Sequence, residues 1–272
     1  MLWKNRRMSG NVLDQRRMGA GSMGIGGLIL GAVVVYLSGG NPMDYLVQNS
    51  VNVQRQEVSP QSEEQKNFVA VVLADTEDVW NEIFRRNNLR YEEPKLVLFS
   101  QMTRSACGSA SSAVGPFYCP GDKQVYLDLS FFRQLSNSLG AQGDFASAYV
   151  IAHEVGHHVQ NLLGVERAFR RDMEGLGERE RNRLSVKMEL QADCLAGVTT
   201  RHIQSTKNVL ESGDLEEAMN AASAVGDDKL QQASSGQVVP DSFTHGSSAD
   251  RVRAFKVGYQ DGQPQACLET FR

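Results

Sequence analysis

The chain has 272 residues, 41% of them hydrophobic, and carries a formal net charge of −4 at pH 7. This length predicts one sizeable domain with smaller appendages. The acidic balance excludes the basic footprint that is typical of nucleic-acid-binding proteins.

Basic residues crowd the N-terminus of the chain. The first 17 residues contain one acid, Asp14, and the cations Lys4, Arg6, Arg7, Arg16 and Arg17. No charged residue follows until position 44, and the apolar core of this uncharged stretch is GIGGLILGAVVVYL. About 20 uncharged residues suffice to cross a bilayer, and a positive flank keeps the preceding segment in the cytoplasm.

These features predict a single-pass protein of the bacterial inner membrane. Residues 1–17 would be cytoplasmic, 18–40 a transmembrane anchor and 41–62 a linker, with a domain at 63–272 in the periplasm or outside the cell. A cleaved signal peptide is the alternative, but the segment YLSGGNPM lacks a clear A-x-A cleavage site. A buried helix of a soluble domain is a further alternative, against which the charge step argues.

The remainder of the chain alternates helical and strand patterns. Helical spacing of apolar residues predicts helices at 63–88, 148–164, 181–204 and 248–262, and a surface helix at 214–235. The apolar run 95–100 predicts a strand, and 124–132 begins as an alternating strand that turns into a helix near Ser130. The fold class is therefore α+β, mostly helical with a small sheet. We expect the strand VYLDL at 125–129 to form the sheet edge beside a cleft.

The helix at 148–164 carries the sequence HEVGHH, with His153, Glu154, His157 and His158. Residues four apart lie on one face of a helix, with Cβ atoms about 5–6 Å apart, so His153 and His157 can bind one zinc ion at about 2.0–2.1 Å. Glu154 points to the side and can reach a water bound there, as in the H-E-x-x-H zinc hydrolases. His158 faces elsewhere and is not expected to bind metal.

A catalytic zinc site needs a third protein ligand. The motif H-E-x-x-H-x-x-G-x-x-H is excluded because Gln160 and Leu163 occupy its last two defined positions. The helix at 181–204 offers Glu189 and Asp193, again four apart and among apolar residues, where charges need a partner or a metal. We predict Glu189 as the ligand and Asp193 as hydrogen-bond acceptor for a ligating histidine. The reverse assignment stays open.

The four cysteines are Cys107, Cys119, Cys194 and Cys267, with no C-x-x-C spacing. An even number without zinc spacing in an exported domain predicts disulfides. Four cysteines allow three connectivities. We predict a bond between Cys194 and Cys267, which would tie the C-terminal tail to the helix that carries Glu189, and this leaves Cys107 with Cys119 across a short loop.

Several segments together resemble one known family. They are WKNRRMSGNVLDQRR, CGSASSAVGPFYCP, VYLDLSFF, HEVGHHVQ, ELQADCLAGV and THGSSADR, and they span nearly the whole chain. The chain resembles the bacterial membrane-anchored "putative neutral zinc metallopeptidase" family. The resemblance implies a zincin-like peptidase domain with one Zn²⁺ per chain and a protein or peptide substrate of unspecified identity.

We therefore expect a zinc-dependent peptidase in which a zinc-activated water attacks the peptide bond and Glu154 is the general base. Related zinc peptidases stabilise the developing negative charge with a His or Tyr from a late segment, which makes His245 the candidate and Arg251 its orienting or substrate-binding neighbour. Tyr118 and Tyr126 are weaker candidates. The alternatives are a non-catalytic zinc-containing binding module of the envelope and a zinc amidase that acts on cell-wall peptide.

Overall fold

The structure is a computed structural model that describes residues 1–16, 35, 41 and 59–271. The predicted membrane anchor at 18–40 lies outside the described residues, apart from Val35. Among the helices in the described part of the chain, none combines the length and apolarity needed to cross a membrane.

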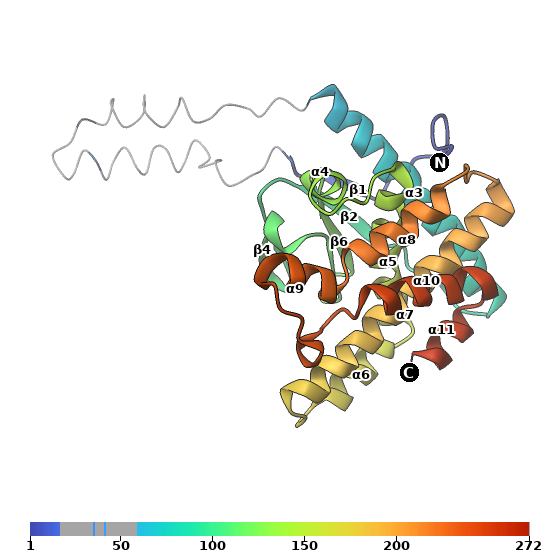
Figure 1. Ribbon diagram of the computed structural model, residues 1–272. Coiled ribbons are helices and arrows are strands. Elements are labelled where there is room, and N and C mark those ends of the chain that lie inside the picture. The colour runs from blue at the N-terminus through green and yellow to red at the C-terminus, as the bar shows by residue number, and fades with distance from the viewer. Residues whose placement is uncertain (17–34, 36–40, 42–58, 272) are drawn as a thin grey trace.

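A four-stranded mixed sheet has the strand order β1-β2-β6-β5 (Figure 1). Strands β1 (Val12–Asp14), β2 (Lys95–Phe99) and β6 (Gln124–Asp128) are parallel, and β5 (Phe117–Cys119) pairs antiparallel with β6. The expected strand at 95–100 is confirmed. The expectation that VYLDL forms the sheet edge is wrong, because β6 is paired on both sides and β5 is the edge strand. A separate hairpin joins β3 (Met102–Ser105) and β4 (Gly108–Ser111).

Helices form most of the described molecule, as the predicted fold class required. They are α3 (Pro60–Arg86), α4 (Ser130–Asn137), α5 (Asp144–Leu162), α6 (Val165–Met173), α7 (Glu178–Lys207), α8 (Asp214–Ala224), α9 (Asp227–Ser235), α10 (Ser248–Asp261) and α11 (Pro264–Thr270). Short 3-10 turns lie at Ser112–Val114 and Pro240–Ser242. The helix expected to follow the strand near Ser130 is α4, and the last long helix is capped by Gly262 as predicted.

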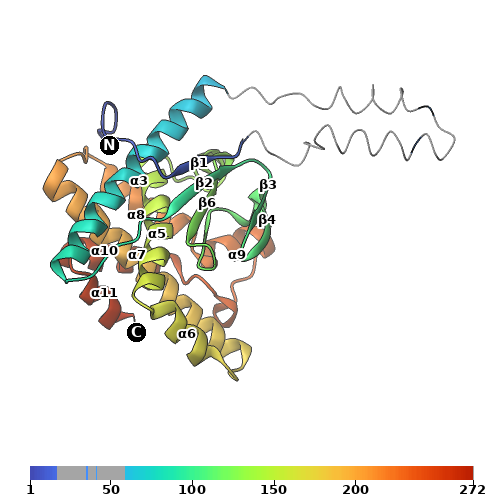
Figure 2. The same ribbon diagram turned by 180° about the vertical axis from the view of Figure 1, so that it is seen from behind.

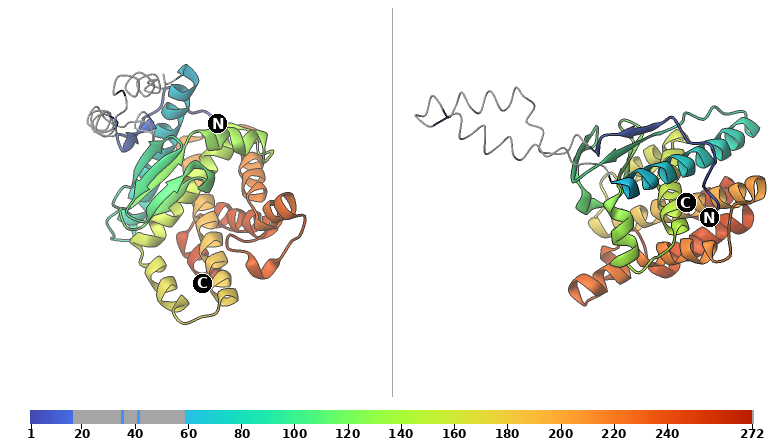
Figure 3. Two further views of the ribbon diagram at one scale, coloured as in Figure 1. Left: turned by 90° about the vertical axis from the view of Figure 1, so that its left-hand side faces the viewer. Right: turned by 90° about the horizontal axis from the view of Figure 1, so that it is seen from above.

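Helix α5 is the centre of the fold and is buried continuously from Phe145 to Gly156. The sheet lies on one side of it and the C-terminal helices lie on the other (Figure 3, left). Helix α7 approaches α5 closely because Gly156 has no side chain, since a Cβ there would lie 2.9 Å from the Ala192 carbonyl oxygen. This close approach brings the acids of α7 next to the histidines of α5.

Helix α10 packs on the opposite side of α7, again through glycines. A Cβ on Gly197 would lie 2.1 Å from the Phe255 carbonyl oxygen, and one on Gly258 would lie 1.8 Å from the Cys194 carbonyl oxygen. The predicted bond between Cys194 and Cys267 is confirmed and ties α11 to α7. The bond between Cys107 and Cys119 closes the hairpin segment onto β5.

The region 214–235 is two helices rather than the one surface helix that was expected. Gly226 separates α8 from α9 in an extended conformation, and a Cβ there would lie 2.4 Å from the Ser248 backbone nitrogen. Helix α8 is part of the core, because its small residues Ala218, Ala221 and Ala222 are fully buried. The alanines let α8 pack tightly against α5.

Residues 1–16 lie along α3 and add strand β1 to the sheet (Figures 2 and 3). The expected division of the chain at residues 17 and 63 does not coincide with this packing. Helix α3 begins at Pro60, inside the expected linker, and the first 16 residues belong to the same folded unit. The sequence pattern could not show this, because the partners of these residues in α3 lie 46 positions or more further along the chain.

Candidate active site

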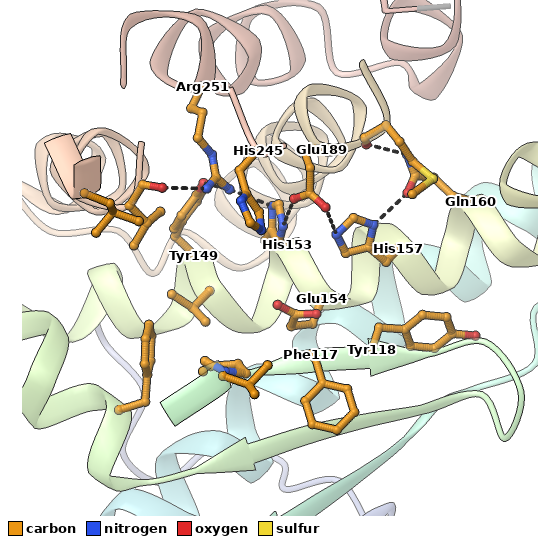
Figure 4. A pocket seen from close by; sticks show the side chains of 18 of the residues that line it. Phe117, Tyr118, Tyr149, His153, Glu154, His157, Gln160, Glu189, His245 and Arg251 are labelled. Carbon is orange, nitrogen blue, oxygen red and sulfur yellow. Dashed lines mark hydrogen bonds and ion pairs between the residues drawn. The ribbon is translucent and has the colours of Figure 1, made fainter. Parts of the chain in front are cut away.

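His153 and His157 project from α5 towards Glu189 on α7 (Figure 4). The Nε2 atom of His153 lies 3.2 Å from one carboxylate oxygen of Glu189, and that of His157 lies 3.4 Å from the other. Ligand atoms about 2.0–2.1 Å from a tetrahedral ion are about 3.3 Å apart. The two distances run to different oxygens of Glu189, and one ligand atom from each of the three side chains lies within 4.8 Å of the others. The three side chains are therefore close enough together to hold one metal ion.

The other ring nitrogens of these histidines already have partners. His153 Nδ1 donates to Asp193 at 2.7 Å, and His157 Nδ1 donates to Gln160 Oε1 at 2.8 Å. A proton on Nδ1 leaves the Nε2 lone pair free for a metal. The two acids of α7 therefore have different positions. Glu189 faces the Nε2 atoms of both histidines, whereas Asp193 faces the Nδ1 side of the His153 ring.

Gln160 was not predicted, although its position three residues after His157 offered a signal. Its amide nitrogen donates to the Met188 carbonyl oxygen at 2.8 Å and to Gln191 at 2.9 Å. These bonds fix which end of the amide faces His157. Gln160 therefore orients the second histidine and joins α5 to α7.

Asp193 is completely buried at the centre of a polar network. Arg251 of α10 donates to both of its oxygens, at 2.8 and 2.9 Å, and the Tyr149 hydroxyl also donates to it. Burial alone would raise the pKa of Asp193, but the charges of Arg251 and His153 hold it at about 2. Arg251 was expected to orient His245 or to bind the substrate. Its hydrogen bonds go to Asp193, Tyr149 and the Val225 carbonyl, and it lines the same cleft as His245.

The electrostatics of the histidine pair favour a cation. Burial disfavours a charge on His153, but the carboxylates of Asp193 and Glu189 raise its pKa to about 10. Glu189 likewise raises the pKa of His157 against the effect of burial. The carboxylates that raise these pKa values would attract a divalent ion in the same way, and the ion would take the place of the Nε2 protons when it binds.

Glu154 lies one residue after the first histidine and points away from Glu189, into the space between α5 and β5 (Figure 4). The side chain is buried, and this burial raises the pKa of its carboxyl above the ordinary value. A carboxylate with a raised pKa is a better proton acceptor near neutral pH.

His245 lies in the loop between α9 and α10, beside His153 and Glu189, and lines the same cleft as Glu154 (Figure 4). The loop is held by Asp227, whose Oδ2 accepts the backbone N–H groups of Thr244, His245 and Gly246 at 2.7 to 3.0 Å. His245 Nδ1 lies 3.2 Å from Asp227 Oδ1, and this hydrogen bond raises the pKa of His245. Asp227 was not predicted, because its role depends on a contact 18 residues along the chain.

A cleft of about 610 Å³ is lined by His153, His157, Glu189, Glu154, Gln160, Tyr149, Arg251 and His245. One end is apolar, and its lining includes Phe131, Leu139, Val150, Val225 and Leu230. The other end carries the ion pair of Glu166 and Arg170 at 2.6 Å. The edge strand β5 and the loop before it form one wall.

The two tyrosine candidates have other roles. The Tyr118 hydroxyl lines the cleft but bonds to His158 Nδ1 at 3.0 Å and to Asn161 at 2.8 Å. The Tyr126 hydroxyl donates to Asp122 at 2.8 Å, away from the cleft lining. His158 is fully buried and donates from Nε2 to the Glu92 carbonyl at 2.6 Å, so it faces away from the metal ligands as expected.

A histidine pair, a carboxylate that faces it from a neighbouring helix and a buried acid in a cleft are features of metal-dependent hydrolases. The family model "Putative neutral zinc metallopeptidase" matches residues 1–271, and the chain belongs to this family.

Two Escherichia coli relatives, from strains K12 and O6:H1, are both called "Uncharacterized protein YpfJ". Each is 50% identical to the chain over 282 residues, covering 98% of both sequences. A Mycobacterium bovis relative, "Uncharacterized protein Mb2605", is 44% identical over 66% of this chain and 63% of its own length. No solved structure matches the chain.

Proposed function

We propose that this protein hydrolyses peptide bonds with one zinc ion, using Glu154 as general base. The observation that carries the proposal is the pair of separations, 3.2 and 3.4 Å, between the two Nε2 atoms and Glu189. They bring two ring nitrogens and a carboxylate close enough together to bind one metal ion. A site that served structure alone would have no use for Glu154, whose carboxylate opens to the cleft.

Zinc, when bound, lowers the pKa of water and polarises a carbonyl group. Glu154 takes the proton of the attacking water and later passes it to the leaving amine. His245, whose pKa is raised by its hydrogen bond to Asp227, offers an N–H to the carbonyl oxygen as negative charge develops there. Arg251 and Tyr149 hold Asp193, and Asp193 holds His153.

The free edge of β5 supplies a binding surface for an extended peptide. The chain runs from Gly115, where a Cβ would lie 3.6 Å from Phe131, to Pro120, whose carbonyl accepts from Asn161 at 3.4 Å. A substrate paired antiparallel with β5 runs the other way, from the end near Glu166 to the apolar end of the cleft. The residue that follows the scissile bond then enters the apolar end.

The test is made on the full chain with two substitutions. Glu189→Ala should lose zinc, because it removes a ligand, whereas Glu154→Gln should keep about one zinc per chain and lose cleavage of a peptide mixture. Elemental analysis and mass spectrometry of the products provide the measurements. Glu166→Gln is the control, since it changes an acid of the cleft away from the ligands.

Zinc retained by Glu189→Ala at wild-type affinity would show that the third ligand is wrong. Full activity of Glu154→Gln would show that the general base is wrong.

A further inference from the structure

We propose that residues 1–16 are an integral part of the peptidase unit and lie on the same side of the membrane as its active site. They are held by an acidic face of α3, formed by Asp75, Glu77 and Asp78. This placement differs from a cytoplasmic N-terminal tail, and three sets of contacts carry it.

The first set is a group of ion pairs. Arg6 pairs with Asp75 at 2.5 Å, and Arg7 pairs with Glu77 at 3.0 Å and with Asp78 at 2.6 Å. The side chains of Asp75 and Glu77 are only 3% and 2% exposed. Removing the partner of a buried charge is strongly destabilising. Asp75 also pairs with Lys207 of α7 at 2.8 Å, so Glu77 is the buried acid that needs an N-terminal cation.

Within the described part of the chain, every side-chain hydrogen-bond donor to the Glu77 carboxylate comes from the N-terminal segment. Its other oxygen accepts from the Ser9 hydroxyl and, at 2.9 Å, from the Asn11 amide. Its hydrogen-bond donors among the described residues are therefore Arg7, Ser9 and Asn11. Without residues 1–16, a carboxylate in the middle of α3 would have no partner.

The second set is the backbone pairing of β1. Val12, Leu13 and Asp14 pair with Leu96, Val97 and Leu98 of β2. The bonds continue on both sides, from the Leu96 N–H to the Asn11 carbonyl at 3.0 Å and from the Gln15 N–H to the Leu98 carbonyl at 2.7 Å. An apolar central strand would otherwise become an unpaired edge.

The third set closes the segment at Arg16, which is 6% exposed. Its guanidinium donates to Asp14 at 2.6 Å, to Glu63 at 2.5 Å and to the Ser62 carbonyl at 2.9 Å. The last described residue of the N-terminal segment thus lies against the first turn of α3.

A single membrane crossing within 18–40 would put residues 1–16 and 60–271 on opposite sides, and these contacts require one side. The positive charges that indicate a cytoplasmic flank are used in ion pairs instead, at Arg6, Arg7 and Arg16. Two disulfides in the domain favour the oxidising side. Both parts then lie outside the cytoplasm.

Cysteine labelling in cells tests the placement. Met8 and Leu89 are 55% and 51% exposed and lie in the two parts, and every described native cysteine is already bonded. Full-length Met8→Cys and Leu89→Cys proteins are treated with a membrane-impermeant maleimide before and after the cytoplasmic membrane is opened. We expect both to react before opening. Reaction of Leu89→Cys alone would overturn the proposal, and protection of both would overturn the placement outside the cytoplasm.

Charge exchange tests the contacts separately from the compartment. Arg7→Glu and Glu77→Arg should each lower Tm by on the order of 10 °C, because each leaves a buried charge unpaired. The double exchange should recover part of the loss. Lys4→Glu is the matched control, since the Lys4–Glu64 pair is 70% and 57% exposed and should change Tm little. Equal Tm values for Glu77→Arg and the wild type would contradict the docking.

Discussion

Asp227 has the largest effect on the pKa of His245, and this gives a prediction at the scale of residues. The carboxylate raises the pKa of His245, so the imidazole keeps its proton to higher pH than usual. If the cationic form stabilises the transition state, kcat/KM falls as the pH rises through that pKa. Asp227→Asn removes the anion, lowers the pKa of His245 and should move this alkaline limb to lower pH.

The measurement is a pH profile of kcat/KM for the wild type, Asp227→Asn and His245→Ala. His245→Ala should lose about 10²–10³-fold in activity and lack the limb. Asp241→Asn is the control, because this exposed acid pairs with Arg179 and lies off the cleft lining. If the alkaline fall of kcat/KM occurs at the same pH in Asp227→Asn as in the wild type, that fall reports the titration of another group.

The residues that a helix spacing brings together could be predicted from the sequence. His153 and His157 are four residues apart on α5, and Glu189 and Asp193 are four residues apart on α7. The roles of Tyr149 and Asp227 could not be predicted, because they depend on helix contacts across 44 and 18 positions. The hydrogen bonds from Arg251 to Asp193, in place of the expected role at His245, have the same cause. They follow from the close packing of α10 on α7.

At the scale of elements, the disulfide between Cys194 and Cys267 supports α7, which presents Glu189 and Asp193. It closes a loop of 73 residues. In the chain-entropy model such a loop contributes about 4 kcal/mol. Cys267→Ser should therefore lower Tm and speed the loss of zinc to a chelator.

Cys107→Ser is the matched comparison for this loss. Its bond spans 12 residues and ties the hairpin to β5, away from α7. It should change zinc retention less than Cys267→Ser, measured by chelator competition. Equal zinc loss in both variants would show that the bond at Cys194 has no special role at the site.

The direction of β5 predicts which side of the scissile bond carries a large apolar side chain. With an antiparallel substrate, the new N-terminus of the product should be Leu, Phe or a similar residue. Leu230→Lys places a charge at the apolar end and should reduce kcat/KM for such peptides by about 10–200-fold. Val238→Lys is the control, as Val238 is similarly exposed but does not line the cleft.

Sequencing of products from a peptide library distinguishes the two substrate directions. Apolar residues that precede the cut would mean that the peptide runs parallel to β5. The sequence alone did not predict β5 as the edge, because its three residues lie among prolines and cysteines and lack an alternating pattern. The longer strand VYLDL has the pattern, but its two neighbours in the sheet are fixed by tertiary contacts.

For the whole molecule, the charge pattern at the N-terminus was interpreted as a cytoplasmic flank, but the same pattern is consistent with a second placement. A basic segment before an uncharged stretch fits a cytoplasmic flank, and it also fits a segment that binds acids of its own domain. Which of the two placements holds depends on Asp75 and Glu77, two acids within the buried, mostly apolar stretch of α3. Such acids inside an apolar helix signal a missing partner, but the sequence does not say which cation supplies it.

The last prediction follows from the contact of Arg16 with Ser62 and Glu63, which places the two ends of the segment 17–58 close together. A Gly/Ser linker of about six residues reaches roughly 20 Å and should replace that segment without strain. The shortened protein should keep the Tm and zinc content of the full chain.

A protein that begins at residue 59 lacks β1 and the partners of Glu77, so it should melt at lower temperature. Calorimetry of both proteins, with added peptide 1–16 restoring part of the loss, decides whether the first 16 residues complete the fold. Equal Tm values with and without them would show that the domain folds alone.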